Sequence, residues 1–96
     1  MILSKKQIAF LRGKANTLKP IFQVGKDGVS ENFIEGIDLA LTSHELIKIA
    51  VLKTAPEELR TLSLDIIAPL KAYIVQIIGR TIVLYRPSKK RIIELP

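Results

Sequence analysis

The sequence predicts an α/β domain in which helices pack on one four-stranded mixed sheet, with the element order α-β-α-β-α-β-β. Two observations lead to this prediction. Segments with apolar residues at helical intervals alternate along the chain with short runs of β-branched and aliphatic residues. Near the end of the chain, two such runs are joined by a glycine-containing pair, which is typical of a hairpin. Because 96 residues with 48% apolar and 25% charged side chains suit one core, we expect a single compact domain over residues 1–96.

The first helix is expected over about residues 5–17. Ser4 and Gln7 have the spacing of a capping box, and apolar residues continue behind them at helical intervals. The basic residues of this helix are expected mostly on its outer face. Pro20 follows, and the apolar run 21–24 predicts a short buried strand.

The second helix is expected after a glycine-rich turn, with Ser30 as its N-cap. Its apolar residues form one stripe, while Glu31, Glu35 and Asp38 fall on the opposite side. This pattern predicts a half-buried helix with an acidic outer face. Residues 46–52 then predict a strand, because they are rich in β-branched and aliphatic side chains.

A third helix is expected from Thr54 and Pro56 onward, with the proline near its first turn. Glu57 and Glu58 would be favoured there by the helix dipole. Pro69 is expected to end this helix.

The two runs around Gly79-Arg80 predict a hairpin with a type II′ turn. With a two-residue loop, strict alternation predicts a core-facing set made of Tyr73, Val75, Ile77, Ile82 and Leu84. The opposite set is Ile74, Gln76, Ile78, Thr81, Val83 and Tyr85. Because this second set is also rather apolar, we expect the first helix to cover part of it.

Charge is segregated along the chain, which carries a formal net charge of +6. Residues 1–26 hold six basic residues and no acidic one, whereas residues 27–65 hold eight acidic residues against three basic ones. Residues 66–96 return to six basic residues against one acidic residue. Basic ends of this kind favour a polyanion partner, and a solvated surface without a partner is the alternative.

Several functional classes are disfavoured by what the composition lacks. There is no cysteine, which excludes disulfides, thiolate metal sites and cysteine nucleophiles. The apolar stretch at the amino terminus ends before a secretory core forms, and no apolar run approaches the ~20 residues that cross a bilayer. His44 is the only histidine and is expected to make a contact at a helix C-terminus. We therefore expect a soluble cytoplasmic protein that is not an enzyme and uses no metal, cofactor, membrane partner or small-molecule substrate.

The motif Gly25-Lys26-Asp27-Gly28 lies between the first expected strand and the second helix. Glycine accepts a positive φ, and a backbone without Cβ lets a phosphate approach the N–H groups of a helix N-terminus. Loops of this type clamp single-stranded RNA in KH domains. Lys26 is then expected to face an anion, and Asp27 to cap the helix or make a local turn contact. A tight turn without a ligand is the alternative, because a GxxG spacing alone is weakly specific.

Three segments within residues 3–91 are distinctive: "LSKKQIAFLRGKANTLKPIFQVGKDGVSENFIEGIDLAL", "HELIKI" and "QIIGRTIVLYRPSKK". In these segments, and so over nearly its whole length, the chain resembles the bacterial YhbY-type CRM domain proteins. The resemblance implies an RNA-binding fold similar to the carboxy-terminal domain of translation initiation factor three, associated with precursors of the large ribosomal subunit. It also implies that the GxxG loop contacts RNA, although here the loop follows a strand whereas KH loops join two helices.

RNA-binding residues are expected in three basic elements, which we expect to gather on one surface. In the GxxG loop these residues are Gly25, Lys26 and Gly28. In the first helix they are Lys5, Lys6, Arg12 and Lys14, and in the "YRPSKK" segment they are Arg86, Lys89 and Lys90. They would hold ribosomal RNA by its phosphates, with shape dominating over base identity because aromatic side chains are few. The chain is expected to act as a monomer in assembly of the large subunit. The alternative is an adaptor that docks a basic ribosomal or assembly protein through its acidic second helix.

Overall fold

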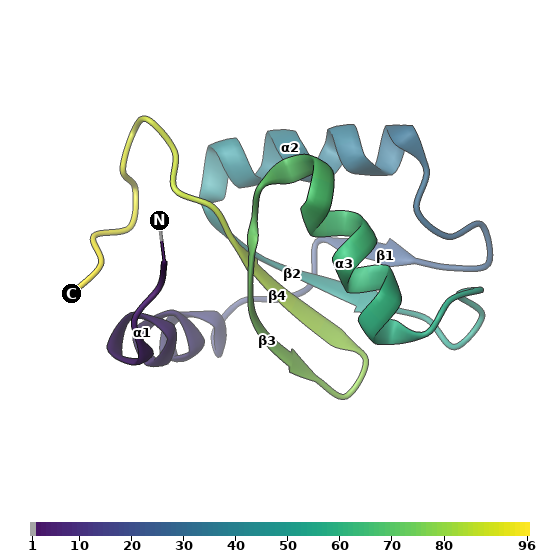
Figure 1. The fold of residues 1–96 in the computed structure, drawn as a ribbon, viewed down its shortest axis with the longest axis horizontal. Coiled ribbons are helices and arrows are strands. Elements are labelled where there is room, and N and C mark those ends of the chain that lie inside the picture. The colour runs from purple at the N-terminus through teal and green to yellow at the C-terminus, as the bar shows by residue number, and fades with distance from the viewer. Residues whose placement is uncertain (1) are drawn as a thin grey trace.

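The computed structural model describes residues 2–96, and its helices and strands follow the order that the sequence predicts (Figure 1). The elements are α1 (Lys5–Ala15), β1 (Phe22–Val24), α2 (Glu31–His44), β2 (Leu46–Val51), α3 (Leu59–Leu70), β3 (Tyr73–Ile78) and β4 (Thr81–Tyr85). The strands form one sheet in the order β1-β2-β4-β3. Strand β1 runs parallel to β2, and the other neighbours are antiparallel. The predicted mixed four-stranded sheet is therefore confirmed.

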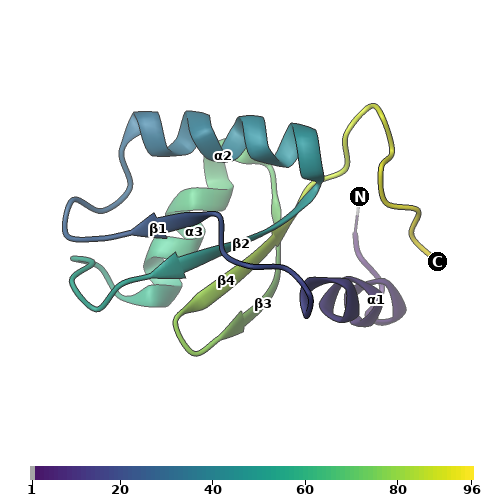
Figure 2. The same ribbon diagram turned by 180° about the vertical axis from the view of Figure 1, so that it is seen from behind.

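Helices cover both faces of this sheet and create two apolar clusters (Figures 1 and 2). Helices α2 and α3 pack on one face, where the larger cluster includes Ile37, Leu41, Ile49, Leu62, Ile66, Ile82 and Leu84. Helix α1 packs on the other face with Leu11, Ala15, Leu46, Val75, Val83 and Tyr85. Residues 47 and 46 of β2 belong to different clusters because successive side chains of a strand point to opposite faces. The prediction that the first helix covers the second face of the hairpin is confirmed.

The predicted side-chain faces of β3 are partly wrong, because this strand contains a β-bulge. Ile74 pairs with Leu84 and Gln76 pairs with Val83, so that Val75 is an extra residue. A bulge reverses the alternation on one side of it. Val75 consequently joins the α1 cluster, and Ile74 packs against the α2–α3 cluster.

The hairpin turn itself follows the prediction. Gly79 has a φ of 55°, and Arg80 is not among the described residues with positive φ. This combination fits a type II′ turn. Arg80 then fastens the turn to β2, since its Nε and Nη2 donate to the carbonyl oxygens of Val51 and Leu52 at 2.8 and 2.9 Å.

Two helix boundaries differ from the prediction. The capping box of α1 is present, with Ser4 Oγ accepting from Gln7 N at 3.1 Å, but the helix ends at Ala15. Helix α3 begins only at Leu59, so the expected first-turn residues Pro56 and Glu57 precede it. The helix was expected to end at Pro69, but Pro69 lies inside its last turn and the helix ends at Leu70. The chain leaves the helix at Lys71, whose φ of 53° is left-handed.

Candidate nucleic-acid interface

The GxxG motif forms a turn closed by a hydrogen bond from Gly28 N to Gly25 O at 3.0 Å. Its two glycines are not equivalent. Gly28 has a φ of +68°, and a Cβ there would lie 3.2 Å from Cγ of Pro56. Gly25 has ordinary φ, and a Cβ there would meet Leu52 Cδ1 at 3.6 Å, a normal contact. Only Gly28 is therefore required by backbone conformation.

The turn leads directly into the N-terminus of α2. Ser30 is the N-cap, since its Oγ accepts a hydrogen bond from Phe33 N at 3.1 Å, as predicted. Asp27 does not cap the helix. Lys26 and Asp27 are both exposed, and within residues 2–96 no hydrogen bond or ion pair engages the Asp27 carboxylate. The turn thus presents one cation and one anion to solvent.

A second loop lies beside the GxxG turn because β1 and β2 are parallel and end at the same edge of the sheet. Leu52 N donates to Val24 O at 2.8 Å, which ties the two loops together. Lys53 is exposed in this second loop. Lys53 was not among the predicted RNA-binding residues, although a parallel pairing of the first two strands would have predicted its position.

Helix α1 presents its basic residues to solvent, as predicted. Lys5, Lys6, Arg12 and Lys14 are all exposed. Arg12 and Lys14 lie in the last turn, where the helix dipole favours cations. The Lys14 ammonium also lies 5.5 Å from the centroid of the Phe10 ring, a cation–π contact that restricts its position.

The C-terminal segment adds a basic turn near α1. Arg91 N donates to Ser88 O at 3.2 Å, and Lys89, Lys90 and Arg91 are exposed around this turn. The segment then packs back on the α1 cluster through Ile93. The basic turn and α1 are therefore parts of one end of the molecule.

One buried carboxylate, that of Glu45, fixes both ends of the basic turn. Its Oε2 accepts hydrogen bonds from Ser88 N at 2.6 Å and Ser88 Oγ at 2.7 Å, and its Oε1 accepts from Ile93 N at 2.7 Å. Burial raises the pKa of Glu45, but these hydrogen bonds outweigh burial and hold its pKa below the ordinary value. This role could not be predicted from the sequence, where Glu45 is only one of the eight acidic residues of the middle segment.

Arg86 has a different environment from the other predicted RNA-binding cations. Its Nη1 donates to Asp38 Oδ1 at 2.7 Å and to Leu70 O at 3.2 Å. Its Nη2 donates to Asp38 O at 2.9 Å and Thr42 Oγ1 at 3.0 Å. With a side chain only 19% exposed, Arg86 joins β4 to α2 and α3. It also removes Asp38 from the set of unpaired acids on α2.

The expectation that all three basic elements gather on one surface is wrong. Helix α1 and the C-terminal turn lie together, but the GxxG turn lies at the opposite end of the molecule's longest dimension, 38 Å (Figures 1 and 2). The reason is topological. Strand β1 runs away from α1, and the GxxG turn follows its far end. The molecule therefore has one large basic end, and the GxxG turn lies apart from it with Lys26, Lys53 and Asp27 exposed.

The family model for the CRS1 / YhbY (CRM) domain matches residues 3–86. The chain belongs to this family. It is 47% identical over 96 residues to "Probable RNA-binding protein YqeI" of Bacillus subtilis, covering 99% of this chain and all of that protein. It is 42% identical to "RNA-binding protein" of Haemophilus influenzae, covering 98% of this chain and 95% of that protein. The solution structure of SAV1595 from Staphylococcus aureus matches 99% of this CRM domain and all of that chain, with a TM-score of 0.81 and 42% identity.

The face of this CRM domain formed by α2 and α3 is acidic. Glu31 and Glu35 of α2 face Glu57 and Asp65 across a groove of about 540 Å³, whose apolar residues include Ile34. A hydrogen bond with Asp65 raises the pKa of Glu57, together with burial and the charge of Asp65. The acidic surface was predicted only for the second helix, but it also includes Glu57 and Asp65.

Three further features of the CRM domain concern membrane spans, metal ligands and the single histidine. Within residues 2–96, no helix is long and apolar enough to cross a bilayer. The same residues contain no group of three or more side chains suited to hold a metal ion. His44 ends α2 and is exposed, close to the basic end of the molecule.

Proposed function

We propose that this CRM domain binds RNA through its basic end and through the separate GxxG turn, and that its natural RNA is ribosomal RNA in a precursor of the large subunit. The observation that carries the proposal is the basic end formed by α1 and the C-terminal turn. There, exposed lysines and arginines from distant parts of the chain meet, and Glu45 holds the turn in place. Each phosphate that such a cation neutralises releases counterions and adds salt-sensitive affinity.

The GxxG turn is the second proposed contact. Lys26 and Lys53 supply charge there, and the turn leads into the N-terminus of α2, where the helix dipole favours an anion. With the two sites at opposite ends of a 38 Å molecule, one RNA that touches both must extend along the protein or fold around it. Such spacing selects RNA by shape, because few aromatic side chains are present to read bases.

The ribosomal part of the proposal is supported by the resemblance to YhbY-type proteins. We propose a non-catalytic, cytoplasmic, monomeric assembly factor. It is tested by ultraviolet crosslinking in cells, with the crosslinked nucleotides mapped and the protein followed across a sucrose gradient. Crosslinks in large-subunit ribosomal RNA and cosedimentation with its precursors are expected. Crosslinks confined to other RNAs would refute the ribosomal assignment while leaving RNA binding intact.

A second function, docking of a basic protein, is favoured by the acidic groove between α2 and α3. Four carboxylates rim its apolar floor, which suits a lysine- or arginine-rich segment. The test is a pull-down of ribosomal and assembly proteins with Glu31 and Glu35 both changed to lysine. Asp38 is left unchanged in this variant, because it pairs with Arg86. Loss of captured proteins with unchanged RNA affinity is expected for an adaptor.

A further inference from the structure

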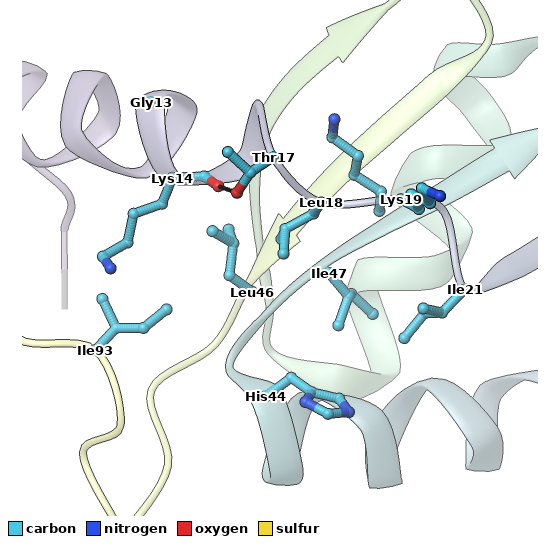
Figure 3. A pocket seen from close by; sticks show the side chains of 11 residues that line it. Gly13, Lys14, Thr17, Leu18, Lys19, Ile21, His44, Leu46, Ile47 and Ile93 are labelled. Atoms are coloured by element: carbon cyan, nitrogen blue, oxygen red, sulfur yellow. Dashed lines mark hydrogen bonds between the residues drawn. The ribbon is translucent and has the colours of Figure 1, made fainter.

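A groove of about 560 Å³ opens at the basic end of the molecule (Figure 3). It lies among the end of α1, the segment that follows α1, strand β2, the end of α2 and the C-terminal segment. Its volume is within the usual range for small-ligand sites, about 300–1,000 Å³.

The rim of this groove is cationic. Lys14, Lys19 and Lys48 line it, and none of its lining residues carries a carboxylate. Within residues 2–96, no hydrogen bond or ion pair engages the ammonium groups of Lys19 and Lys48. Several like charges around one hollow, without neutralising partners, favour an anionic occupant.

The floor of the groove is apolar. Leu18 and Ile21 keep 37% and 51% of their surface exposed, and Leu46 and Ile93 lie nearby (Figure 3). The imidazole of His44 stands at one side of this floor. A simple anion such as phosphate would use the lysines but leave the aliphatic surface in contact with water. The best occupant combines negative charge with a flat, largely apolar body.

We propose that this groove binds one unstacked nucleotide of single-stranded RNA. Its base would lie on the aliphatic floor beside His44, and the flanking phosphates would contact Lys19 and Lys48. A paired base in a duplex cannot enter such a hollow without leaving its stack. This inference rests on the proposed RNA binding and deepens it, because it adds single-strand preference to the basic end.

The path of the strand follows from the neighbours of the groove. Lys14 belongs to both the basic face of α1 and the groove rim. Ile93, which also lines the groove, lies just after the basic turn at residues 88–91. A single strand that places one base in the groove can therefore contact both basic elements with its adjoining phosphates.

The test is an NMR titration of the isotope-labelled full-length protein with three probes at equal concentration of negative charge. These probes are a short oligouridine, the same oligomer without bases, and a polyglutamate peptide. We expect oligouridine to shift the backbone amides of residues 13–21 and 44–48, and the other two probes to shift them much less. Oligouridine that binds without shifting these amides would refute the groove but leave RNA binding in place. Equal shifts with all three probes would show that the groove binds any polyanion, and would also refute the nucleotide site. Absence of all RNA binding would refute the proposed function itself.

A charge-matched pair of double variants supplies the second measurement. Lys19→Gln with Lys48→Gln removes two charges from the groove, whereas Arg60→Gln with Lys71→Gln removes two from exposed positions in and after α3. The first variant is expected to weaken oligouridine binding by roughly tenfold, and the control by less than about twofold. Thermal unfolding checks that both variants stay folded. Equal weakening by the two variants would show that only net charge matters, and would overturn the proposal. If the groove amides shift with protein concentration in the absence of RNA, the groove binds a second copy of the chain instead of a nucleotide.

Discussion

Glu45 holds Ser88 through two hydrogen bonds to one carboxylate oxygen, at 2.6 Å from the backbone N–H and 2.7 Å from the hydroxyl. The same carboxylate binds Ile93 through its other oxygen. Since Glu45 is fully buried, these bonds form in a medium where each is stronger than in water. The position of the basic turn between residues 88 and 93 thus depends on a residue that itself cannot contact RNA.

Replacing Glu45 with glutamine is expected to loosen the basic turn. The variant keeps the shape but loses the charge, and its amide nitrogen cannot accept a hydrogen bond, so we expect a loss of about 2 kcal/mol in the free energy of unfolding. RNA affinity should fall as well, because the lysines of the turn lose their fixed position. Urea unfolding and fluorescence anisotropy measure the two effects. Ser88→Ala, which removes only the hydroxyl, should cost about 1 kcal/mol. A Glu45→Gln protein as stable as the parent would contradict the clamp.

The low pKa of Glu45 makes stability depend on pH in one direction. In the folded state its pKa lies below the ordinary value of 4.5, so ionised Glu45 stabilises the fold above that pH. This contribution is lost as the pH falls below 4.5 towards the folded-state pKa. We expect the free energy of unfolding to fall more steeply with acid for the parent than for Glu45→Gln, whose side chain does not titrate. Parallel pH curves for the two proteins would show that Glu45 is not the group responsible.

The two glycines of the GxxG turn are expected to tolerate alanine differently. At Gly28, a φ of +68° and a Cβ contact with Pro56 of 3.2 Å should cost about 1–2 kcal/mol of stability. At Gly25, a Cβ makes only normal contacts, and the change should stay within about 0.5 kcal/mol. Chemical denaturation of Gly25→Ala and Gly28→Ala measures the difference. Equal losses would mean that the turn is not held as described.

The elements themselves could be predicted because local signals agreed with the fold. Ser4 with Gln7 and Ser30 with its following helix are caps that act within one turn, so the sequence carries them completely. Gly79 with Arg80 similarly determines the hairpin turn through backbone conformation alone.

Features that depend on distant contacts could not be predicted. The bulge at Val75 leaves no local mark, because both faces of β3 are apolar. Arg86 looked like one more basic residue, and only tertiary packing brings it to Asp38. The separation of the GxxG turn from α1 depends on strand direction, which charge patterning cannot reveal.

Reversing Lys26 is expected to weaken RNA binding without unfolding the protein. Lys26 is exposed, and among residues 2–96 no hydrogen bond or ion pair engages its ammonium group. Lys26→Glu should lower affinity for ribosomal RNA several-fold and reduce the slope of log affinity against log salt by about 1. Arg60→Glu, the same charge change on an exposed part of α3, is the control. If both variants bind RNA equally well, the GxxG turn does not contact it.

Substitution of Arg86 is expected to lower stability, and substitution of the lysines of the basic turn is expected to lower RNA binding. Arg86→Gln breaks an ion pair and hydrogen bonds to α2 and α3, so we expect a loss of about 2–3 kcal/mol in stability. With the fold intact at low temperature, its salt slope for RNA should match the parent's. The double change of Lys89 and Lys90 to glutamine should do the reverse, leaving the unfolding temperature unchanged while lowering the salt slope by about 2. Salt-dependent anisotropy and thermal unfolding on the same samples give both quantities. If Arg86→Gln lowered the salt slope as the double change of Lys89 and Lys90 does, the guanidinium would leave Asp38 to bind phosphate, and its structural assignment would be wrong.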